Sequence, residues 1–194
     1  MSKAEKTRQF ILEKTAPIFN KKGYAGTSLN DMTDATGLTK GSIYGNFTNK
    51  DDVALAAFDF NVQKVRNIIS HEMASHETVR EQLLVYVNVY EDFLKHPFPV
   101  GGCPILNTSV EADDTHEPLK QKACDAVMAW KNNITKLIKK GIDNNEFKGT
   151  VDAEQAALTL IAMIEGAIMI TKVTGKINYR KMIMRSAETF INSL

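Results

Sequence analysis

Hydrogen-bond donors are gathered in the stretch Gly37–Phe47, whose sequence is GLTKGSIYGNF. Apolar Ile43 and Phe47 are spaced so that a helix here would bury them on one face. The outward face would then carry side chains that donate to phosphate oxygens and to base edges: Thr39, Lys40, Ser42, Tyr44 and Asn46. This pattern indicates a surface that binds nucleic acid rather than a catalytic centre.

Three glycines in the same stretch oppose helix stability. A glycine inside a helix costs about 1 kcal/mol relative to alanine, so another advantage must favour Gly41 and Gly45. Without side chains at these positions, the backbone of a short helix can approach a duplex closely. We therefore also expect Gly41 to lie in contact with the duplex.

Capping signals place these residues in two short helices. Ser28 and Asp31 have the spacing of a capping box, and Gly37 is predicted to end the helix in a left-handed conformation. Thr39 is then expected to cap the next helix, with Leu38 and Ile43 as a hydrophobic staple. Two short helices joined by a tight glycine turn predict a helix-turn-helix, whose second helix enters the major groove of DNA.

Helical periodicity continues along the rest of the chain, which predicts an all-α protein of about nine helices. A first helix is expected over residues 4–20, closed by Lys21, Lys22 and Gly23, and Pro17 should kink it or remove a hydrogen bond. Asn49 with Asp52 is expected to open a long helix. Asp152 and Asn178 are the predicted caps of the last two helices. Further helices are expected near residues 79–94, 104–112, 118–143, 153–174 and 179–193. The predicted domains are a helix-turn-helix domain over 1–50 and a helical sensing and dimerisation domain over 51–194.

Charge is unevenly distributed along the chain. Residues 1–50 carry eight lysines and arginines against four acidic residues, a net charge of +4, and the remainder carries −3. A basic first quarter fits a module that meets a polyanion, although a surplus this small can also be an ordinary surface. We expect no secretion signal or membrane-spanning segment, and the two cysteines suggest a reducing cytoplasm.

The run GTSLNDMTDATGLTKGSIYGNFTNKDDVALAAFD resembles the N-terminal DNA-binding domain of the TetR family of transcriptional repressors. The resemblance implies a homodimer that binds a palindromic operator in double-stranded DNA and is released by a small-molecule inducer. It also implies that Lys50 holds a phosphate and that Thr27 or Ser28 clamps the DNA backbone. Gly45 departs from the family pattern, and Asn46 could simply terminate its helix.

A dimer interface is expected on the last two helices, which in the family pair with their mates as a four-helix bundle. The alternative is that the same residues pack only within one chain. The predicted interface combines small and large apolar residues: Ala156, Leu160, Met163, Ile164, Ala167, Ile168, Ile183, Ala187 and Phe190.

The resemblance implies a ligand site in the helical body, and aromatic and adaptable residues there could line it, although such residues at helical spacing are often plain core. The predicted lining is Tyr86, Tyr90, Phe93, Cys103, Met128 and Trp130. Cys103 follows two glycines at a helix start, which favours a thiolate, so an electrophile or redox switch is an alternative to a small buried hydrophobe. Cys124 is expected to be structural.

Two other functional classes are considered. An enzyme would need a catalytic motif, and the sequence contains no zinc-protease motif, phosphate-binding loop or dinucleotide fingerprint. The four histidines are expected to be solvated at helix ends, so we predict no catalytic residue, metal or cofactor. A purely structural helical protein remains as an alternative, but it would leave the donor-rich surface around Lys40 unexplained.

Overall fold

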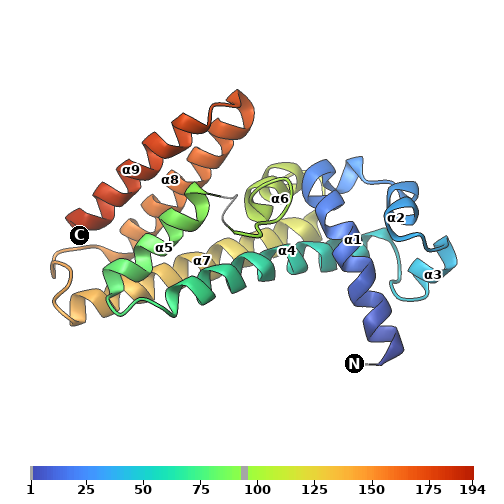
Figure 1. The fold of residues 1–194 in the computed structure, drawn as a ribbon, viewed down its shortest axis with the longest axis horizontal. Coiled ribbons are helices and arrows are strands. Elements are labelled where there is room, and N and C mark those ends of the chain that lie inside the picture. The colour runs from blue at the N-terminus through green and yellow to red at the C-terminus, as the bar shows by residue number, and fades with distance from the viewer. Residues whose placement is uncertain (1, 93–95) are drawn as a thin grey trace. The chain divides into compact units, whose positions relative to one another are not determined.

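The computed structural model describes residues 2–92 and 96–194. This part of the chain folds as nine helices without strands, which confirms the predicted all-α fold (Figure 1). The helices are α1 (Lys3–Gly26), α2 (Leu29–Thr36), α3 (Lys40–Tyr44), α4 (Lys50–Met73), α5 (Val79–Glu91), α6 (Pro104–Ala112), α7 (Glu117–Asp143), α8 (Ala153–Thr174) and α9 (Ile177–Ser193).

The chain forms two compact units. The first comprises Met1–Val65 and Pro99–Cys124, and the second comprises Arg66–Phe98 and Asp125–Leu194. Helices α4 and α7 each contribute residues to both units, and α6 belongs with α1–α3 although it follows α5 in the chain. The expected division after residue 50 stays a prediction.

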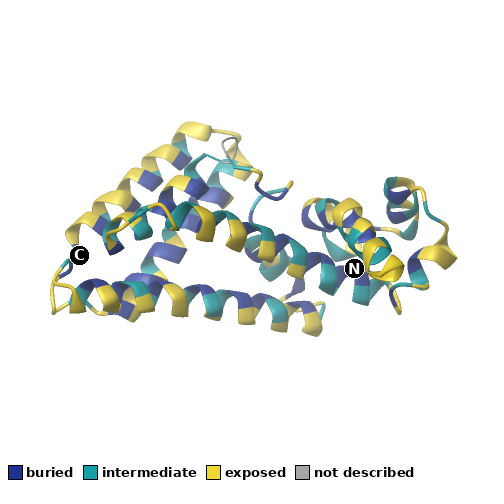
Figure 2. Ribbon diagram, turned by 60° about the horizontal axis from the view of Figure 1, so that its bottom comes forward, coloured by how far each residue is buried: buried dark blue, intermediate teal, exposed yellow. Residues whose placement is uncertain are grey.

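Helices of both units carry buried residues on one side and exposed residues on the other (Figure 2). In the first unit the buried sides of α1, α2, α3 and α4 form one apolar cluster around Ile11, Met32, Ile43, Phe47 and Val53. These five side chains are at most 2% exposed. Burial of such residues contributes on the order of 2 kcal/mol each, which is what stabilises helices as short as α2 and α3.

Local capping in the first unit follows the sequence prediction. The Ser28 hydroxyl accepts from the Asp31 N–H at 3.1 Å, and the Asp31 carboxylate accepts from the Ser28 N–H at 2.8 Å. Gly37 ends α2 with φ 67° and ψ 11°, the left-handed conformation that glycine adopts without penalty. The capping box and the glycine turn are therefore confirmed.

Helix α1 departs from helical geometry at Gly23, the residue predicted to close the first helix, and not at Pro17. The kink at Pro17 is therefore wrong, and the alternative of a lost backbone hydrogen bond remains. Gly23 has φ 76° and ψ 178°, a conformation that side chains rarely permit. A proline at position 17 removes the N–H that would bond to the Glu13 carbonyl four residues earlier. The Ala16 carbonyl, next to Pro17, accepts from the Asn61 amide on α4 at 2.9 Å.

The second unit is held together by α5, α8 and α9, which pack on one another. Arg80 on α5 links distant segments, because its guanidinium donates to the Ile191 carbonyl at 2.7 Å and to the Glu146 carbonyl at 2.8 Å. Asp152 caps α8 as predicted. The Asn178 cap is wrong: α9 begins at Ile177 after Lys176, which makes no side-chain capping bond.

Helix α8 is, by length and composition alone, the one helix of the described residues that could cross a membrane. Its buried side chains pack within the second unit, against α5 and α9. A core helix of a soluble protein has this composition and packing as well.

Candidate nucleic-acid interface

Helix α3 is positioned by a cap at its start and by buried anchors along one side. The Thr39 hydroxyl accepts from the Ser42 N–H at 3.2 Å, as predicted, and the two hydroxyl oxygens lie 3.0 Å apart. Ile43 is fully buried, and Leu38 packs against the same cluster, which agrees with the predicted staple. The orientation of α3 about its axis is therefore fixed by the apolar core.

The opposite side of α3 is open to solvent. Thr39, Lys40, Gly41 and Ser42 are exposed, and Tyr44 is half-buried with part of its ring against the core cluster. An ammonium, hydroxyls and a phenol on one short helix can donate to phosphate oxygens and to base edges together.

Two residues predicted to contact DNA have side chains that bond within the chain instead. Thr27 is fully buried, and its hydroxyl donates to the Gly23 carbonyl at 2.6 Å, so its side chain cannot clamp DNA as the structure stands. The Asn46 amide donates to the Ser42 carbonyl at 2.9 Å, which is the helix-terminating role considered above. Ser28 is exposed but bonded to Asp31 through its capping box.

Asp31 also forms an ion pair with Lys22, whose ammonium lies 2.5 Å from the carboxylate. Hydrogen bonds from Lys22 and Ser28 hold the pKa of Asp31 well below its usual range. The pair fixes the start of α2 and neutralises one lysine of the basic first quarter.

Lys50 begins α4 and lies over an aromatic ring. Its ammonium is 4.4 Å from the centre of the Tyr24 ring, a cation–π geometry. The Tyr24 hydroxyl donates to the Asp51 carboxylate, and this bond, together with burial, raises the pKa of Tyr24 to about 12. The predicted phosphate contact is therefore held in place by a residue that sequence reasoning did not select.

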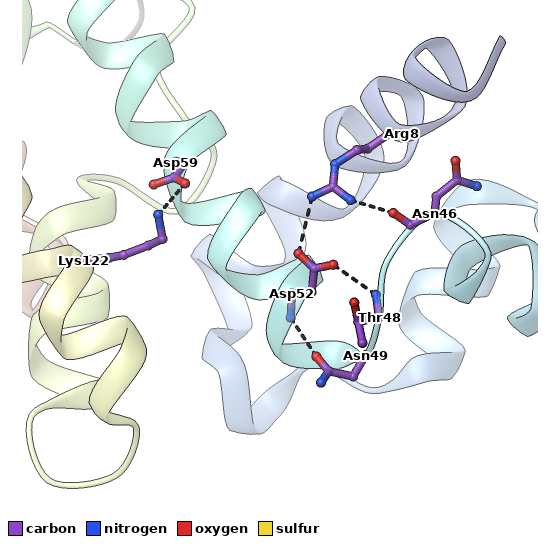
Figure 3. Close-up of polar contacts among 7 residues, drawn as sticks. All are labelled: Arg8, Asn46, Thr48, Asn49, Asp52, Asp59 and Lys122. Carbon is purple, nitrogen blue, oxygen red and sulfur yellow. Dashed lines mark hydrogen bonds and ion pairs between the residues drawn. The ribbon is translucent and has the colours of Figure 1, made fainter. Parts of the chain in front are cut away.

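Arg8 on α1 was also missed, and Figure 3 shows why it matters. Its guanidinium donates to the Asn46 carbonyl at 2.6 Å and lies 3.4 Å from the Asp52 carboxylate. It also stacks on Phe47, 3.9 Å from the ring centre. Arg8 therefore ties the turn between α3 and α4 to α1, and no local pattern marks it because its partners are about forty residues away.

The start of α4 follows the predicted cap with one change. Asp52 donates its N–H to the Asn49 side chain at 2.9 Å, but its carboxylate accepts from the Thr48 N–H at 3.0 Å (Figure 3). Further along α4, Asp59 forms an ion pair with Lys122 on α7 at 2.6 Å.

The predicted ligand residues separate into two groups. Tyr86, Tyr90 and Trp130 form an aromatic cluster in the second unit, where the Tyr90 and Trp130 rings stack with centres 5.4 Å apart. Met128 is 46% exposed, and Cys103 belongs to the first unit. Phe93 lies outside the described residues.

One atom of the aromatic cluster differs from those of an ordinary core. Trp130 is 8% exposed, and its buried indole nitrogen has no hydrogen-bond acceptor among the described residues. Burial raises the pKa of Tyr86 to about 12. An unsatisfied buried donor costs about 1–3 kcal/mol, so the Trp130 N–H favours an acceptor.

Most of the residues predicted to form the dimer interface are buried within their own chain. Met163, Ile183 and Phe190 retain partial exposure, while the others are buried by packing in the second unit: Ala156, Leu160, Ile164, Ala167, Ile168 and Ala187. The strongest apolar stripe of α8 therefore packs on its own chain. Five other large apolar residues of the two helices are exposed: Leu158, Met169 and Val173 on α8, and Ile177 and Met182 on α9.

Cys103 agrees with the predicted alternative of a small buried hydrophobe, whereas Cys124 and one histidine depart from the predictions. Cys103 is completely buried at the start of α6, which leaves its thiol inaccessible to an electrophile in this conformation. Cys124, expected to be structural, is exposed. His116, expected to be solvated, packs against the Tyr24 ring and accepts from the Leu119 N–H at 3.2 Å. Among the described residues, no cluster of three potential metal ligands occurs.

Comparisons with known proteins agree with this geometry. A family described as bacterial regulatory proteins of the tetR family matches residues 11–57, and one described as the tetracyclin repressor-like C-terminal domain matches residues 80–187. An uncharacterised helix-turn-helix regulator of Lactococcus lactis is 30% identical over 89% of this chain and 86% of its own.

Solved structures show the same likeness across the whole chain. A TetR family regulator from Cytophaga hutchinsonii is 49% identical, with a TM-score of 0.96 over 100% of this chain and 97% of the other. A TetR regulator from Chloroflexus aurantiacus is 36% identical, with a TM-score of 0.92 over 98% and 96% of the two chains.

The contacts of Arg8 lead to a stability prediction. An Arg8→Lys variant keeps the charge but loses the planar group that contacts a carbonyl, a carboxylate and a ring together. We expect a loss of about 1 kcal/mol in the free energy of unfolding, measured by urea denaturation. Arg66→Lys, on the exposed side of α4, is the matched control and should change little. Equal stability of the two variants would contradict the anchoring role.

Proposed function

This chain belongs to the TetR family of bacterial transcriptional regulators, and we propose that it is a dimeric repressor released from its operator by a small molecule. The observation that carries the DNA-binding role is the two-sided geometry of α3. Ile43 fixes one side in the core, while Lys40 and Ser42 stand exposed on the other. A helix held in this way presents donors at a fixed angle to a major groove.

A homodimer supplies the second recognition helix. One short helix reads few base pairs, so a palindromic site needs two copies about 34–36 Å apart. On α8, Leu158, Ala162, Gly166, Met169 and Val173 recur every three or four residues and lie on one face. Leu158 and Met169 are each 48% exposed and Val173 is 80% exposed, which leaves an apolar stripe without cover in one chain.

Gly166 supports the assignment of this stripe to the dimer. A side chain at this position would meet nothing within 4 Å in the chain itself. Glycine in a helix interior costs about 1 kcal/mol, so its presence suits a close approach by a helix of the second copy. The proposed interface is therefore rotated from the one expected from sequence, though it uses the same helix.

The aromatic cluster of Tyr86, Tyr90 and Trp130 is the proposed centre of ligand sensing. Its unsatisfied indole N–H offers a hydrogen bond to an acceptor on an incoming molecule, and its rings offer stacking. We therefore propose that the inducer is a flat, uncharged compound with an oxygen acceptor. The complete burial of Cys103 argues against the alternative of a thiol switch. As a DNA-binding regulator, the protein would act in the cytoplasm.

The first prediction concerns DNA binding. Lys40→Ala should weaken binding to the duplex upstream of the protein's own coding region and reduce the slope of log K against log salt by about one, because one phosphate contact is lost. Gel shifts between roughly 50 and 200 mM salt measure this. Lys139→Ala, which removes an exposed charge in the second unit, is the control. Salt-independent binding, or identical behaviour of the two variants, would contradict the proposed interface.

The second prediction concerns the dimer. Gly166→Leu places a large side chain in the middle of the α8 stripe, so we expect dimer dissociation to become at least about tenfold more favourable. Sedimentation equilibrium measures the change, and circular dichroism should show an intact helical fold because the side chain has space within one chain. Gly149→Leu, at another open glycine of the second unit, should leave the dimer unchanged. A Gly166→Leu dimer of normal affinity would place the interface elsewhere.

The third prediction concerns the ligand. Trp130 is the single tryptophan of the chain, so its fluorescence reports on the aromatic cluster directly. In a panel of uncharged aromatic compounds, those that change Trp130 fluorescence should also release DNA. Trp130→Phe keeps a ring but removes the N–H, and thermal shift should show about tenfold weaker binding of the active compounds. Compounds that release DNA equally from both proteins would rule out this site.

A further inference from the structure

We infer that Glu111 on α6 is a positioning residue for DNA binding, acting through Tyr24 on Lys50. This inference rests on the proposed function, because it assigns Lys50 a contact with a phosphate of the operator. It concerns only residues of the first compact unit. The residue in question lies far outside the sequence that matches the DNA-binding family, residues 11–57, and within the part that matches the C-terminal domain.

The Glu111 carboxylate binds the backbone where α1 is broken. One oxygen accepts from the Tyr24 N–H at 2.8 Å, and the other accepts from the Ala25 N–H at 2.9 Å. Gly23 makes room for this contact, because a Cβ atom there would overlap the carboxylate. The positive φ of Gly23 turns the two N–H groups toward α6, so the break in α1 and the position of Glu111 depend on each other.

A second set of bonds holds α6 against the same end of α1. The Asn20 amide donates to the Val100 and Gly102 carbonyls at 2.8 and 2.9 Å. The Asn107 amide on α6 donates to the Asn20 carbonyl and to the Gly101 carbonyl, each at 3.0 Å. Because these bonds fix α6 about one turn before Glu111, the Glu111 carboxylate reaches α1 from a rigid support.

Tyr24 links this backbone contact to the position of the Lys50 ammonium. Its ring supports the Lys50 ammonium at 4.4 Å, and its hydroxyl is bonded to Asp51. His116 packs on the same ring with centres 4.4 Å apart, and its Nε2 atom lies 3.8 Å from the Asp51 carboxylate. The Tyr24 side chain is thus fixed by neighbours, and its backbone is fixed by Glu111.

Charge makes the inference testable, because electrostatics and positioning predict opposite results. Glu111 is an acidic residue in a unit that meets a polyanion, so removal of its charge should by itself strengthen DNA binding. If Glu111 positions Lys50, its removal should weaken DNA binding instead, since the lysine loses its fixed support.

The test compares Glu111→Gln with Asp114→Asn in gel shifts across a range of salt concentrations. Both variants remove one negative charge, and Asp114 is exposed three residues further along the chain. We expect Glu111→Gln to weaken binding about tenfold and to lower the salt slope by about one, as loss of one phosphate contact should. Asp114→Asn should bind as tightly as the unmodified protein or more tightly.

A double variant distinguishes positioning from a general structural role. If Glu111 acts through Lys50, Glu111→Gln should have little further effect in a Lys50→Ala background, because the two changes remove the same contact. Tyr24→Leu removes the ring but leaves the backbone bonds to Glu111, and it should reproduce the lower salt slope. If Tyr24→Leu keeps the salt slope of the unmodified protein, the link from Glu111 to Lys50 through the ring is overturned, whether or not Glu111→Gln folds.

Each outcome bears on one of the two proposals. If the unmodified protein and Asp114→Asn bind DNA and Glu111→Gln binds equally well, the positioning role is overturned and the proposed function stands. Additive effects of Glu111→Gln and Lys50→Ala also overturn it. If the unmodified protein binds no duplex at any salt concentration, the proposed function fails and this inference fails with it.

Discussion

The burial of Ile43 in α3 and of Phe47 just after it is the constraint on which the candidate interface depends. A helix of five residues does not persist by itself, since nucleation costs more than its few hydrogen bonds return. Its position is therefore set by the apolar cluster and by Arg8, which holds the turn that follows. Because these contacts determine which side of α3 faces inward, they also determine which donors face outward.

In the first unit, α3 is accompanied by α6, a helix from a distant part of the chain that supports α1. Helix α6 follows α5 in sequence but belongs to the unit that carries α3. Its contacts with α1 are polar and directional, through Asn107 and Glu111, whereas α3 is held mainly by apolar burial. Directional bonds fix the relative position of backbones more narrowly than apolar contacts do. The surface around Lys50 therefore depends on residues that a domain boundary at residue 50 would leave out.

In the second unit, part of the apolar surface of α8 stays exposed in a single chain. Helix α8 packs one face against α5 and α9 while Leu158, Met169 and Val173 stay exposed on another. A stripe of this kind suits a second copy, and the open space at Gly166 suits close helix packing. The same unit leaves the Trp130 N–H without an acceptor among the described residues. The exposed apolar stripe and the unpaired N–H both destabilise an isolated chain. A second copy would cover the stripe, and a ligand with an acceptor would pair the N–H.

The sequence by itself determined the helices, the capping residues Ser28, Thr39 and Asp152, and the turn at Gly37, because these depend on bonds between residues three or four apart. It also identified the exposed donors at Lys40 and Ser42, since Ile43 marks the opposite face. Only the tertiary structure showed the roles of Arg8, Glu111 and Tyr24, whose partners are distant in the chain. It also decided which face of α8 is buried: both faces are apolar, so periodicity could not choose between them, and packing against α5 and α9 did.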